Sequence, residues 1–145
     1  MSLIFVDTDN TNVTSKLYKG AKAGQAAAKA EGKMQTVVKR IIDKAAGFTT
    51  TKFDKAKGYA IRLEVSKVDT ANHKTNCSLS GSIVRYPPTA TLKRGAGEEM
   101  VSTSMSGSAT ADGTSEGSLL DAIEAIAESL VTKSVPIMRA DYLKR

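Results

Sequence analysis

The chain has 145 residues, of which 41% are hydrophobic and 5% aromatic, and it carries a formal net charge of +6. A chain of this length is near the usual size of one domain with one core, so we expect residues 1–145 to form a single domain. No apolar run approaches the roughly 18 residues that cross a membrane, and the single Cys77 excludes an internal disulfide bond.

The first predicted elements are a short buried strand and a long helix. Residues 3–6 are an apolar run that ends in a cluster of Asp, Thr and Asn residues, which stop strands and cap helices. A helical pattern then extends from Ser15 to Gly47, with Thr14 or Ser15 as its N-cap. Its first part, to about Glu31, is rich in alanine but interrupted by glycines, each of which costs about 1 kcal/mol relative to alanine.

The second part of this helix has the stronger pattern. Its apolar residues recur at steps of three and four and therefore lie on one face. They are Met34, Val37, Val38, Ile41, Ile42 and Ala45. Gly47 then supplies a left-handed C-terminal cap.

After Gly47 the apolar period changes from about 3.6 residues to 2, which predicts strands. Residues 48–53, "FTTTKF", are β-branched and aromatic, and residues 59–66 alternate strictly between apolar and polar side chains. The alternation slips at Lys67 and Val68, which indicates a bulge or the end of the strand. We expect the next residues, 69–76, to form a loop.

Two serine-rich segments, residues 77–86 and 100–110, keep the same alternation, and a Pro-Pro pair ends the first of them. A flexible linker has no reason to keep its apolar residues in phase, so both segments are predicted to be strands. Gly81 and Gly107 fall on the apolar side. These small residues predict that a bulky element, one of the helices, lies against the sheet there.

The last predicted helix begins after "ADGTSEG", with Ser118 as its N-cap and Asp121 three residues later as a weaker form of the capping box. Pro136 should end or sharply kink this helix, which leaves residues 137–145 as a short final helix or a tail. The apolar residues of the helix share one face: Leu119, Ile123, Ile126 and Leu130, widened by Leu120, Ala127 and Val131.

The order of elements is a strand, a helix, three or four strands and a helix, and it predicts an α+β fold. Consecutive strands joined by short loops pair antiparallel, and two amphipathic helices can cover one face of such a sheet. We therefore expect a two-layer sandwich: a mainly antiparallel sheet of about four to five strands with two main helices on one face. The other face carries Ser, Arg and Glu and would meet water or a partner.

The stretch "VDTDNT", residues 6–11, resembles the first motif of the haloacid dehalogenase-type phosphatases. The resemblance implies that Asp7 is a nucleophile and Asp9 a general acid/base. It also implies a magnesium ion that neutralises the charges of the aspartate and the phosphate.

Two features of the sequence oppose this phosphatase interpretation. The family needs helices between the strands of a parallel sheet, yet residues 48–117 contain no helical pattern, and the acidic pair Glu98-Glu99 precedes a strand instead of following one. We therefore expect Asp7 and Asp9 to be turn and cap residues near a helix N-terminus. The magnesium-dependent phosphatase is kept as the alternative function.

The remaining residues predict no cofactor and no metal site. His73 and Cys77 are four residues apart, but the chain has no second His or Cys to complete a structural zinc site. His73 is expected in an exposed loop, and Cys77 shares its phase with Leu79 and Ile83, which favours a buried and inert thiol. The serines form no Gly-x-Ser-x-Gly motif, and "KRGAGEE" has too few glycines for a phosphate-binding loop.

The excess of positive charge lies entirely in residues 1–58, which hold eleven Lys/Arg and five Asp/Glu. Such asymmetry can mark a surface for nucleic acid or anionic lipid. Residues 15–33 combine Lys, Ala and Gly, which favours a solvated helix face instead, because nucleic-acid surfaces interleave aromatic or arginine side chains and this stretch offers only Tyr18. Nucleic-acid binding is therefore the second, less favoured alternative.

A broader resemblance covers most of the chain. The segments "GYAIRLEVSKVD", "CSLSGSIVRY" and "MVSTSMSGSATADG", followed by "GSLLDAIEAIAESLV", look like the small α/β domain of bacterial envelope lipoproteins. Activators of penicillin-binding proteins and the curli secretion lipoprotein are of this type. The resemblance implies a domain that binds partner proteins in the periplasm, but it lies in the order of elements and carries over no functional residue.

From the sequence we therefore expect a non-enzymatic, protein-binding accessory module of the bacterial envelope. Its expected location is the periplasm or the outer envelope, with the cytoplasm as the alternative. The partner is expected to be a protein, bound through an exposed sheet face, a strand edge or the basic helical segment. Catalytic residues, Asp7 and Asp9, are expected only under the phosphatase alternative.

Overall fold

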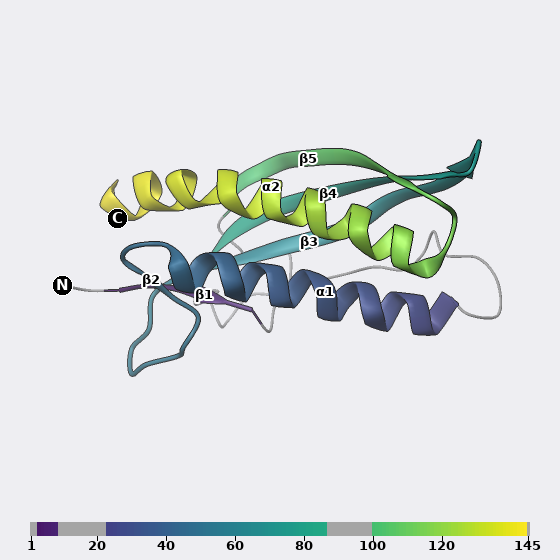
Figure 1. The fold of residues 1–145 in the computed structure, drawn as a ribbon. Coiled ribbons are helices and arrows are strands. Elements are labelled where there is room, and N and C mark those ends of the chain that lie inside the picture. Colours follow the sequence, from purple (N-terminus) through teal and green to yellow (C-terminus); the bar gives the residue numbers. More distant parts are fainter. Residues whose placement is uncertain (1–2, 9–22, 87–99, 145) are drawn as a thin grey trace.

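The computed structural model describes residues 3–8, 23–86 and 100–144 (Figure 1). The predicted N-cap at Thr14 or Ser15, the Pro-Pro pair and "KRGAGEE" lie outside these described residues. The elements in chain order are strand β1 (Ile4–Asp7), helix α1 (Ala23–Lys44), strands β2 (Phe48–Thr49), β3 (Gly58–Ala71), β4 (Lys74–Tyr86) and β5 (Met100–Asp112), and helix α2 (Glu116–Lys144).

The strands form one five-stranded sheet in the order β2-β1-β3-β4-β5. Strands β3, β4 and β5 are a long antiparallel meander, whereas β1 lies between β2 and β3 and runs parallel to both. Helices α1 and α2 lie side by side on one face of this sheet (Figure 1). The predicted α+β fold, a mainly antiparallel sheet with two helices on one face, is confirmed.

The apolar faces predicted for both helices meet the apolar side of the sheet in one core. Helix α1 contributes Ala30, Met34, Val37, Val38 and Ile42, and α2 contributes Leu119, Ala122, Ile123, Ile126, Ala127, Leu130, Val131 and Met138. The meander contributes Tyr59, Ile61, Leu63, Val65, Cys77, Leu79, Ile83 and Met105. Beyond the end of α1, Gly47 has a φ of 84°, which agrees with the left-handed conformation predicted for it.

The two inward-facing glycines make room for different neighbours. A Cβ on Gly107 would lie 2.9 Å from Cγ2 of Ile126, so α2 packs directly onto this point of β5. A Cβ on Gly81 would instead meet Leu63 and Met105 of the adjacent strands. The prediction that a helix lies against the small residues of the sheet is therefore confirmed at Gly107, whereas the nearest atoms at Gly81 belong to the neighbouring strands.

The second face of the sheet is not polar throughout. Phe5, Ala60 and Val84 lie on it and are almost completely buried. The Phe5 ring makes edge contacts with Phe53, at 6.4 Å between centroids, and with Tyr86, at 5.1 Å. The expectation of a polar second face is therefore wrong beside β1, where Phe5 packs against two aromatic rings.

Helix α2 begins one turn earlier than predicted. The Ser115 hydroxyl accepts a hydrogen bond from the backbone N–H of Ser118 at 3.2 Å, which is the geometry of an N-cap. The Ser118 hydroxyl instead donates to the carbonyl of Asp112 at 2.7 Å and helps to close the connection from β5. The predicted N-cap at Ser118 is therefore wrong, because a second serine stands three residues before it.

Pro136 lies inside α2, which continues to Lys144. A proline at this position removes the hydrogen bond to the carbonyl of Thr132, four residues earlier. Pro136 and Thr132 are both exposed, so water can take the place of the missing donor. The prediction that Pro136 ends the helix is therefore wrong, whereas its alternative, a kink at Pro136, stays a prediction.

Strands β3 and β4 are longer than predicted. Residues 69–76, predicted to be a loop, are strand except for the turn at Asn72 and His73, whose φ angles are 54° and 62°. Two positive φ angles are typical of the type I′ turn that closes two-residue hairpins. The predicted slip at Lys67 is confirmed as a register shift after Val65. The predicted strand over 48–53 is limited to β2.

Candidate functional site

The residues of the phosphatase-like motif do not form a site within the described structure. Asp7 is the last residue of β1 and is half-buried, whereas Asp9 and the pair Glu98-Glu99 fall outside the described residues. Strand β1 has parallel neighbours on both sides. The phosphatase family also needs helices between its strands, and the chain from Phe48 to Tyr86 contains strands and turns without a helix.

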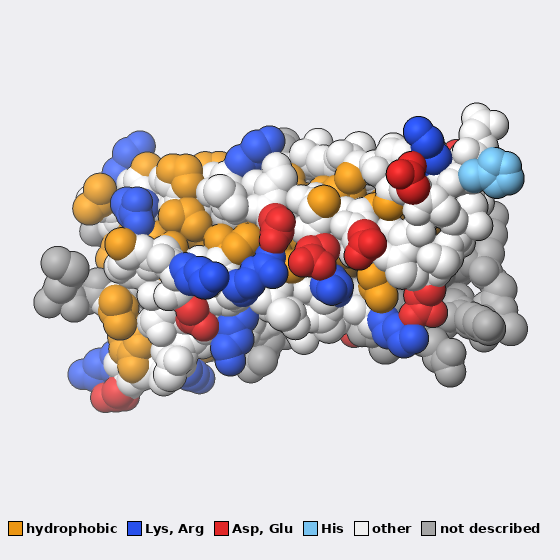
Figure 2. All heavy atoms as spheres, viewed as in Figure 1, with side chains coloured by type: hydrophobic (Ala, Val, Ile, Leu, Met, Phe, Trp, Pro, Cys, Tyr) orange, Lys and Arg blue, Asp and Glu red, His pale blue; other side chains and the backbone are white. Residues whose placement is uncertain are grey.

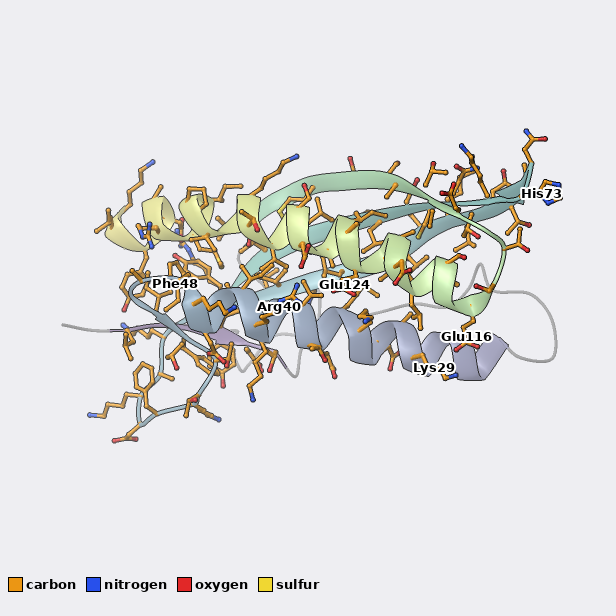
Figure 3. The ribbon with its side chains drawn as sticks, viewed as in Figure 1. Lys29, Arg40, Phe48, His73, Glu116 and Glu124 are labelled. Carbon is orange, nitrogen blue, oxygen red and sulfur yellow. The ribbon has the colours of Figure 1, made fainter. Side chains whose placement is uncertain are left out.

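Among the described residues, His73 and Cys77 have no neighbours with which they could form a metal site. Within the described ranges, no three His, Cys, Asp or Glu side chains are grouped so that they could hold a metal ion. His73 is exposed in the β3–β4 turn at one end of the molecule, as predicted (Figure 3). Cys77 is buried, and burial raises the pKa of its thiol to about 11. The predicted burial of Cys77 is confirmed, and a thiol with so high a pKa keeps its proton at neutral pH.

A row of ion pairs, which we call the ion-pair row, joins α1 to α2 along their outer sides (Figure 3). Lys29 Nζ lies 2.6 Å from Glu116 and Lys33 Nζ lies 3.0 Å from Glu124. Arg40 pairs with Glu124, at 3.6 Å, and with Glu128. The pairs advance in the same direction along both helices, so the two helices run parallel.

The ion-pair row gives the basic segment an internal role. Lys29 and Lys33 are the two lysines of residues 15–33 that the structure describes, and both face acids of α2. A hydrogen bond from Lys33 and its charge lower the pKa of Glu124, and the charge of Arg40 lowers it further. The described part of this segment therefore supports helix pairing and gives no support to the nucleic-acid alternative.

A second polar group, the Asp141 cluster, lies where the end of α2 meets the start of β3. Asp141 accepts a hydrogen bond from the Tyr59 hydroxyl at 2.6 Å, and from Nε and Nη2 of Arg85 at 3.1 and 2.8 Å. Tyr59 is completely buried, and its ring makes an edge contact with Tyr142. A bidentate guanidinium–carboxylate pair of this kind fixes geometry strongly. The Asp141 cluster therefore holds the last turn of α2 on the sheet.

Sequence reasoning did not single out the Asp141 cluster, although one signal was available. The C-terminal end of a helix carries partial negative charge, so an acid in the last turn is unfavourable unless a cation is close. Asp141 stands four residues before the sequence end, within the final turns of α2. Its partner Arg85 comes from β4, 56 residues earlier, so no local pattern could identify the pair.

Strand β5 lies at one edge of the sheet and, among the described strands, pairs only with β4. The pairing is regular from Asp112 to Met105, and two register shifts follow between Met105 and Met100. Residues 101–111 contain no charged residue and no proline. An edge strand of this kind presents a row of backbone N–H and C=O groups that can pair with another chain.

Hydroxyl and amide side chains connect β4 to β5 on the second face. The hydroxyls of Ser78 and Ser108 are 2.8 Å apart, and Thr110 donates to Asn76 at 2.6 Å. Ser106 beside them is exposed. The serine-rich segments are therefore strands, as predicted, and their cross-strand hydrogen bonds hold the outer half of β5 in register.

No protein-family model matches the sequence, and no curated protein matches it. A DUF330 protein from Xanthomonas campestris superposes with a TM-score of 0.54 at 12% sequence identity, over 99% of this chain and 89% of that chain. A Caulobacter crescentus protein provisionally assigned as a lipoprotein gives a TM-score of 0.41 at 11% identity, over 92% of both chains. A hypothetical protein from Chlamydia trachomatis gives 0.46 at 7% identity, over 93% of this chain and 94% of that chain.

The likeness to the DUF330 protein shows a shared fold along nearly the whole chain. With TM-scores below 0.5, the other two structures support no conclusion about fold or function. A specific kinship with activators of penicillin-binding proteins or with the curli secretion lipoprotein is not shown. Neither α1 nor α2 is both long enough and apolar enough to span a membrane.

Proposed function

We propose that this protein is a non-enzymatic accessory module of the bacterial envelope, which binds a partner protein by adding an extended segment of that partner to strand β5. The observation that carries the proposal is the edge of β5, which is long and has no charge or proline from Val101 to Ala111. Strand addition of this kind gains affinity from backbone hydrogen bonds.

The sheet has a second long edge, on β3, and its difference from the edge of β5 supports the choice of β5 as the binding edge. Strand β1 pairs with β3 only from Gly58 to Ala60, so the rest of β3 has no strand on that side among the described residues. This part of β3 carries the charged residues Arg62, Glu64, Lys67 and Asp69. Charged side chains are one of the devices that protect edge strands from pairing. The sheet thus has one protected long edge and one that lacks charge.

The envelope location rests on the resemblance of the element order to small domains of envelope lipoproteins. The phosphatase alternative receives less support, because strands follow one another from Phe48 to Tyr86 without a helix. Magnesium-dependent hydrolysis of a generic phosphate ester that disappears in Asp7→Asn would contradict a non-enzymatic function.

Site-specific photocrosslinking in the living bacterium tests the proposed edge. A photoreactive phenylalanine analogue replaces Ser106 on β5 in one strain and Lys67 on β3 in another; both positions are exposed. After irradiation, the Ser106 position should give a discrete adduct that contains a second protein, and the Lys67 position should not. Fractionation of the same cells should place the adduct in the periplasm or the outer envelope.

A matched variant separates strand pairing from simple proximity. Ser108→Pro places a proline in the straight half of β5, where an added strand would need the backbone of this edge. If the variant folds like the wild type by circular dichroism, it should lose the Ser106 adduct. Equal adducts from Ser106 and Lys67, or none from Ser106, would contradict the proposal.

A further inference from the structure

The exposed large hydrophobic side chains of the described structure gather at one end of the molecule. They are Leu3, Phe53 and Leu143, which are 44%, 39% and 81% exposed. The start of β1, the loop between β2 and β3, and the end of α2 all lie at this end (Figure 1). The β3–β4 turn with His73 lies at the opposite end (Figure 3). Single exposed apolar residues are normal on a protein surface, but their confinement to one end needs an explanation.

Contacts in the sheet fix these three segments together. Phe53 packs edge-on against Phe5, two residues after Leu3. Phe5 is in register with Gly58 of β3, and the next residue, Tyr59, contacts Tyr142, the neighbour of Leu143. The Asp141 cluster adds hydrogen bonds at the same place. The segments that carry the three apolar side chains are therefore joined by contacts within the fold.

The loop that carries Phe53 contains a tight, hydrogen-bonded turn. Ala56 is buried, and its N–H donates to the carbonyl of Phe53 at 3.1 Å. Lys55 lies between them with a φ of 57°, a conformation that costs free energy for a residue with a side chain. The buried Ala56 anchors this tight turn while Phe53 and Lys55 stay exposed.

Lysines surround the apolar side chains of this end. Lys52, Lys55 and Lys57 are exposed in the Phe53 loop, and Lys144 follows Leu143 on α2. Figure 2 shows hydrophobic and Lys/Arg side chains together at the end where α2 terminates.

The acids nearby balance this charge only in part. Asp54 is exposed in the same loop. Asp43 accepts hydrogen bonds from the Thr50 N–H and hydroxyl, and Asp141 is bound by Arg85. Among the described residues, four exposed lysines therefore stand against two exposed aspartates, Asp43 and Asp54, so the surface around the apolar residues is positive.

We propose that this end docks on the surface of a membrane that contains anionic phospholipids. Leu3, Phe53 and Leu143 enter the boundary between headgroups and acyl chains, and Lys52, Lys55, Lys57 and Lys144 contact lipid phosphates. Apolar burial and attraction to anionic lipid together determine how strongly such surfaces bind. The docking goes beyond the proposed partner binding and does not depend on the edge of β5.

Co-sedimentation with lipid vesicles tests the docking. The protein should bind vesicles of phosphatidylcholine mixed with phosphatidylglycerol, bind pure phosphatidylcholine much more weakly, and dissociate as salt is added. The double variant Lys52→Glu/Lys55→Glu should weaken binding by about tenfold or more, since each lysine near an anionic surface contributes a factor of about five. Phe53→Ser/Leu143→Ser should weaken it by a similar factor and leave the charge unchanged.

The opposite end supplies the control. Lys67→Glu/Lys74→Glu makes the same change of charge near the β3–β4 turn, where both lysines are exposed. Its binding should fall by less than about threefold. No binding to the anionic vesicles, or an equal loss in this control, would overturn the proposal. Binding to an acidic protein or a nucleic acid but not to vesicles would also overturn it.

Discussion

Helix α2 is joined to the rest of the molecule by two polar groups of opposite character. Near its start, the ion-pair row pairs side chains that are 30% to 58% exposed, such as Lys29, Glu116 and Glu124. Near its end, the Asp141 cluster combines Arg85, which is 33% exposed, with a carboxylate that is 16% exposed and with the completely buried Tyr59. The two groups therefore differ mainly in the burial of Asp141 and Tyr59, which water reaches less than it reaches the ion-pair row.

The difference in exposure decides what each group contributes. Exposed ion pairs contribute about 0–1 kcal/mol each, because water and salt screen them and long side chains lose freedom. A group buried with hydrogen bonds cannot exchange its partner for water, so removal of one member leaves the others unsatisfied. The end of α2 should therefore be held by the Asp141 cluster, whereas the ion-pair row sets which helix face meets which.

The largest effect is expected for Asp141→Ala. The change leaves the Tyr59 hydroxyl and the Arg85 guanidinium without their acceptor, and it should lower the free energy of unfolding by about 2–3 kcal/mol. Urea denaturation followed by circular dichroism measures this quantity. Asp121→Ala is the control, because Asp121 is exposed on the same helix. If Asp141→Ala lowers the free energy of unfolding by less than about 1 kcal/mol, the Asp141 cluster stabilises the fold no more than the ion-pair row does.

Tyr59→Phe should have an intermediate effect. It removes one hydroxyl and keeps the buried ring, so the free energy of unfolding should fall by about 1–2 kcal/mol. The Arg85 pair with Asp141 remains. Tyr86→Phe is a suitable comparison, because it also removes one hydroxyl and keeps the ring contact with Phe5. If Tyr59→Phe is neutral, the hydrogen bond to Asp141 adds nothing beyond the packing of the ring.

The smallest effect is expected for Glu124→Gln. Glu124 lies on the surface, so the change should lower the free energy of unfolding by less than about 0.5 kcal/mol at pH 7. The folded-state pKa of Glu124 is lowered from 4.5, so its small contribution is present above that pH and is lost as the pH falls through the folded pKa. Denaturation curves of both proteins at pH 7 and pH 3 should therefore converge at pH 3. A gap that widens in acid would contradict this sign.

The elements that the sequence predicted well are those with a long and regular apolar period. Met34, Val37 and Ile42 of α1 and Ile123, Ile126 and Leu130 of α2 are buried as their spacing predicts. The alternation around Ile61 and Leu79 likewise predicted strands with one apolar face. Periodicity predicts these elements because each turn or pleat repeats the same evidence about which side is buried.

Sequence predictions failed at two kinds of position. At some, two neighbouring residues suit the same role, and at others contacts between distant parts of the chain determine the structure. Ser115 and Ser118 both suit an N-cap, and only the geometry of the connection from β5 selects Ser115. Pro136 usually stops a helix, but the buried Met138 and the hydrogen bonds of Asp141 keep α2 helical beyond it. Phe5 is covered by Phe53 and Tyr86, which no short stretch of sequence brings together.

The features of the candidate sites also divide into those that local sequence predicts and those that depend on the whole fold. The strand character of residues 100–110 and the burial of Cys77 followed from alternation, and both are confirmed. The position of β5 at the edge of the sheet depends on strand order, which is a property of the whole fold. The apolar and basic end of the molecule is even harder to predict from short stretches of sequence. Leu3, Phe53 and Leu143 are distant in the chain, and only the folded sheet brings their segments to the same end.

The position of β1 has a consequence for how the protein is made. Ile4 pairs with Phe48 and Phe5 pairs with Gly58, and a Cβ on Gly58 would overlap the carbonyl oxygen of Phe5. Contacts so distant in the chain form late, because a long loop must close before they can stabilise anything. During synthesis, the apolar β1 therefore lacks its β2 partner until residue 49 has been made, and its β3 partner for longer still. A factor that holds nascent chains unfolded would find β1 accessible throughout this interval.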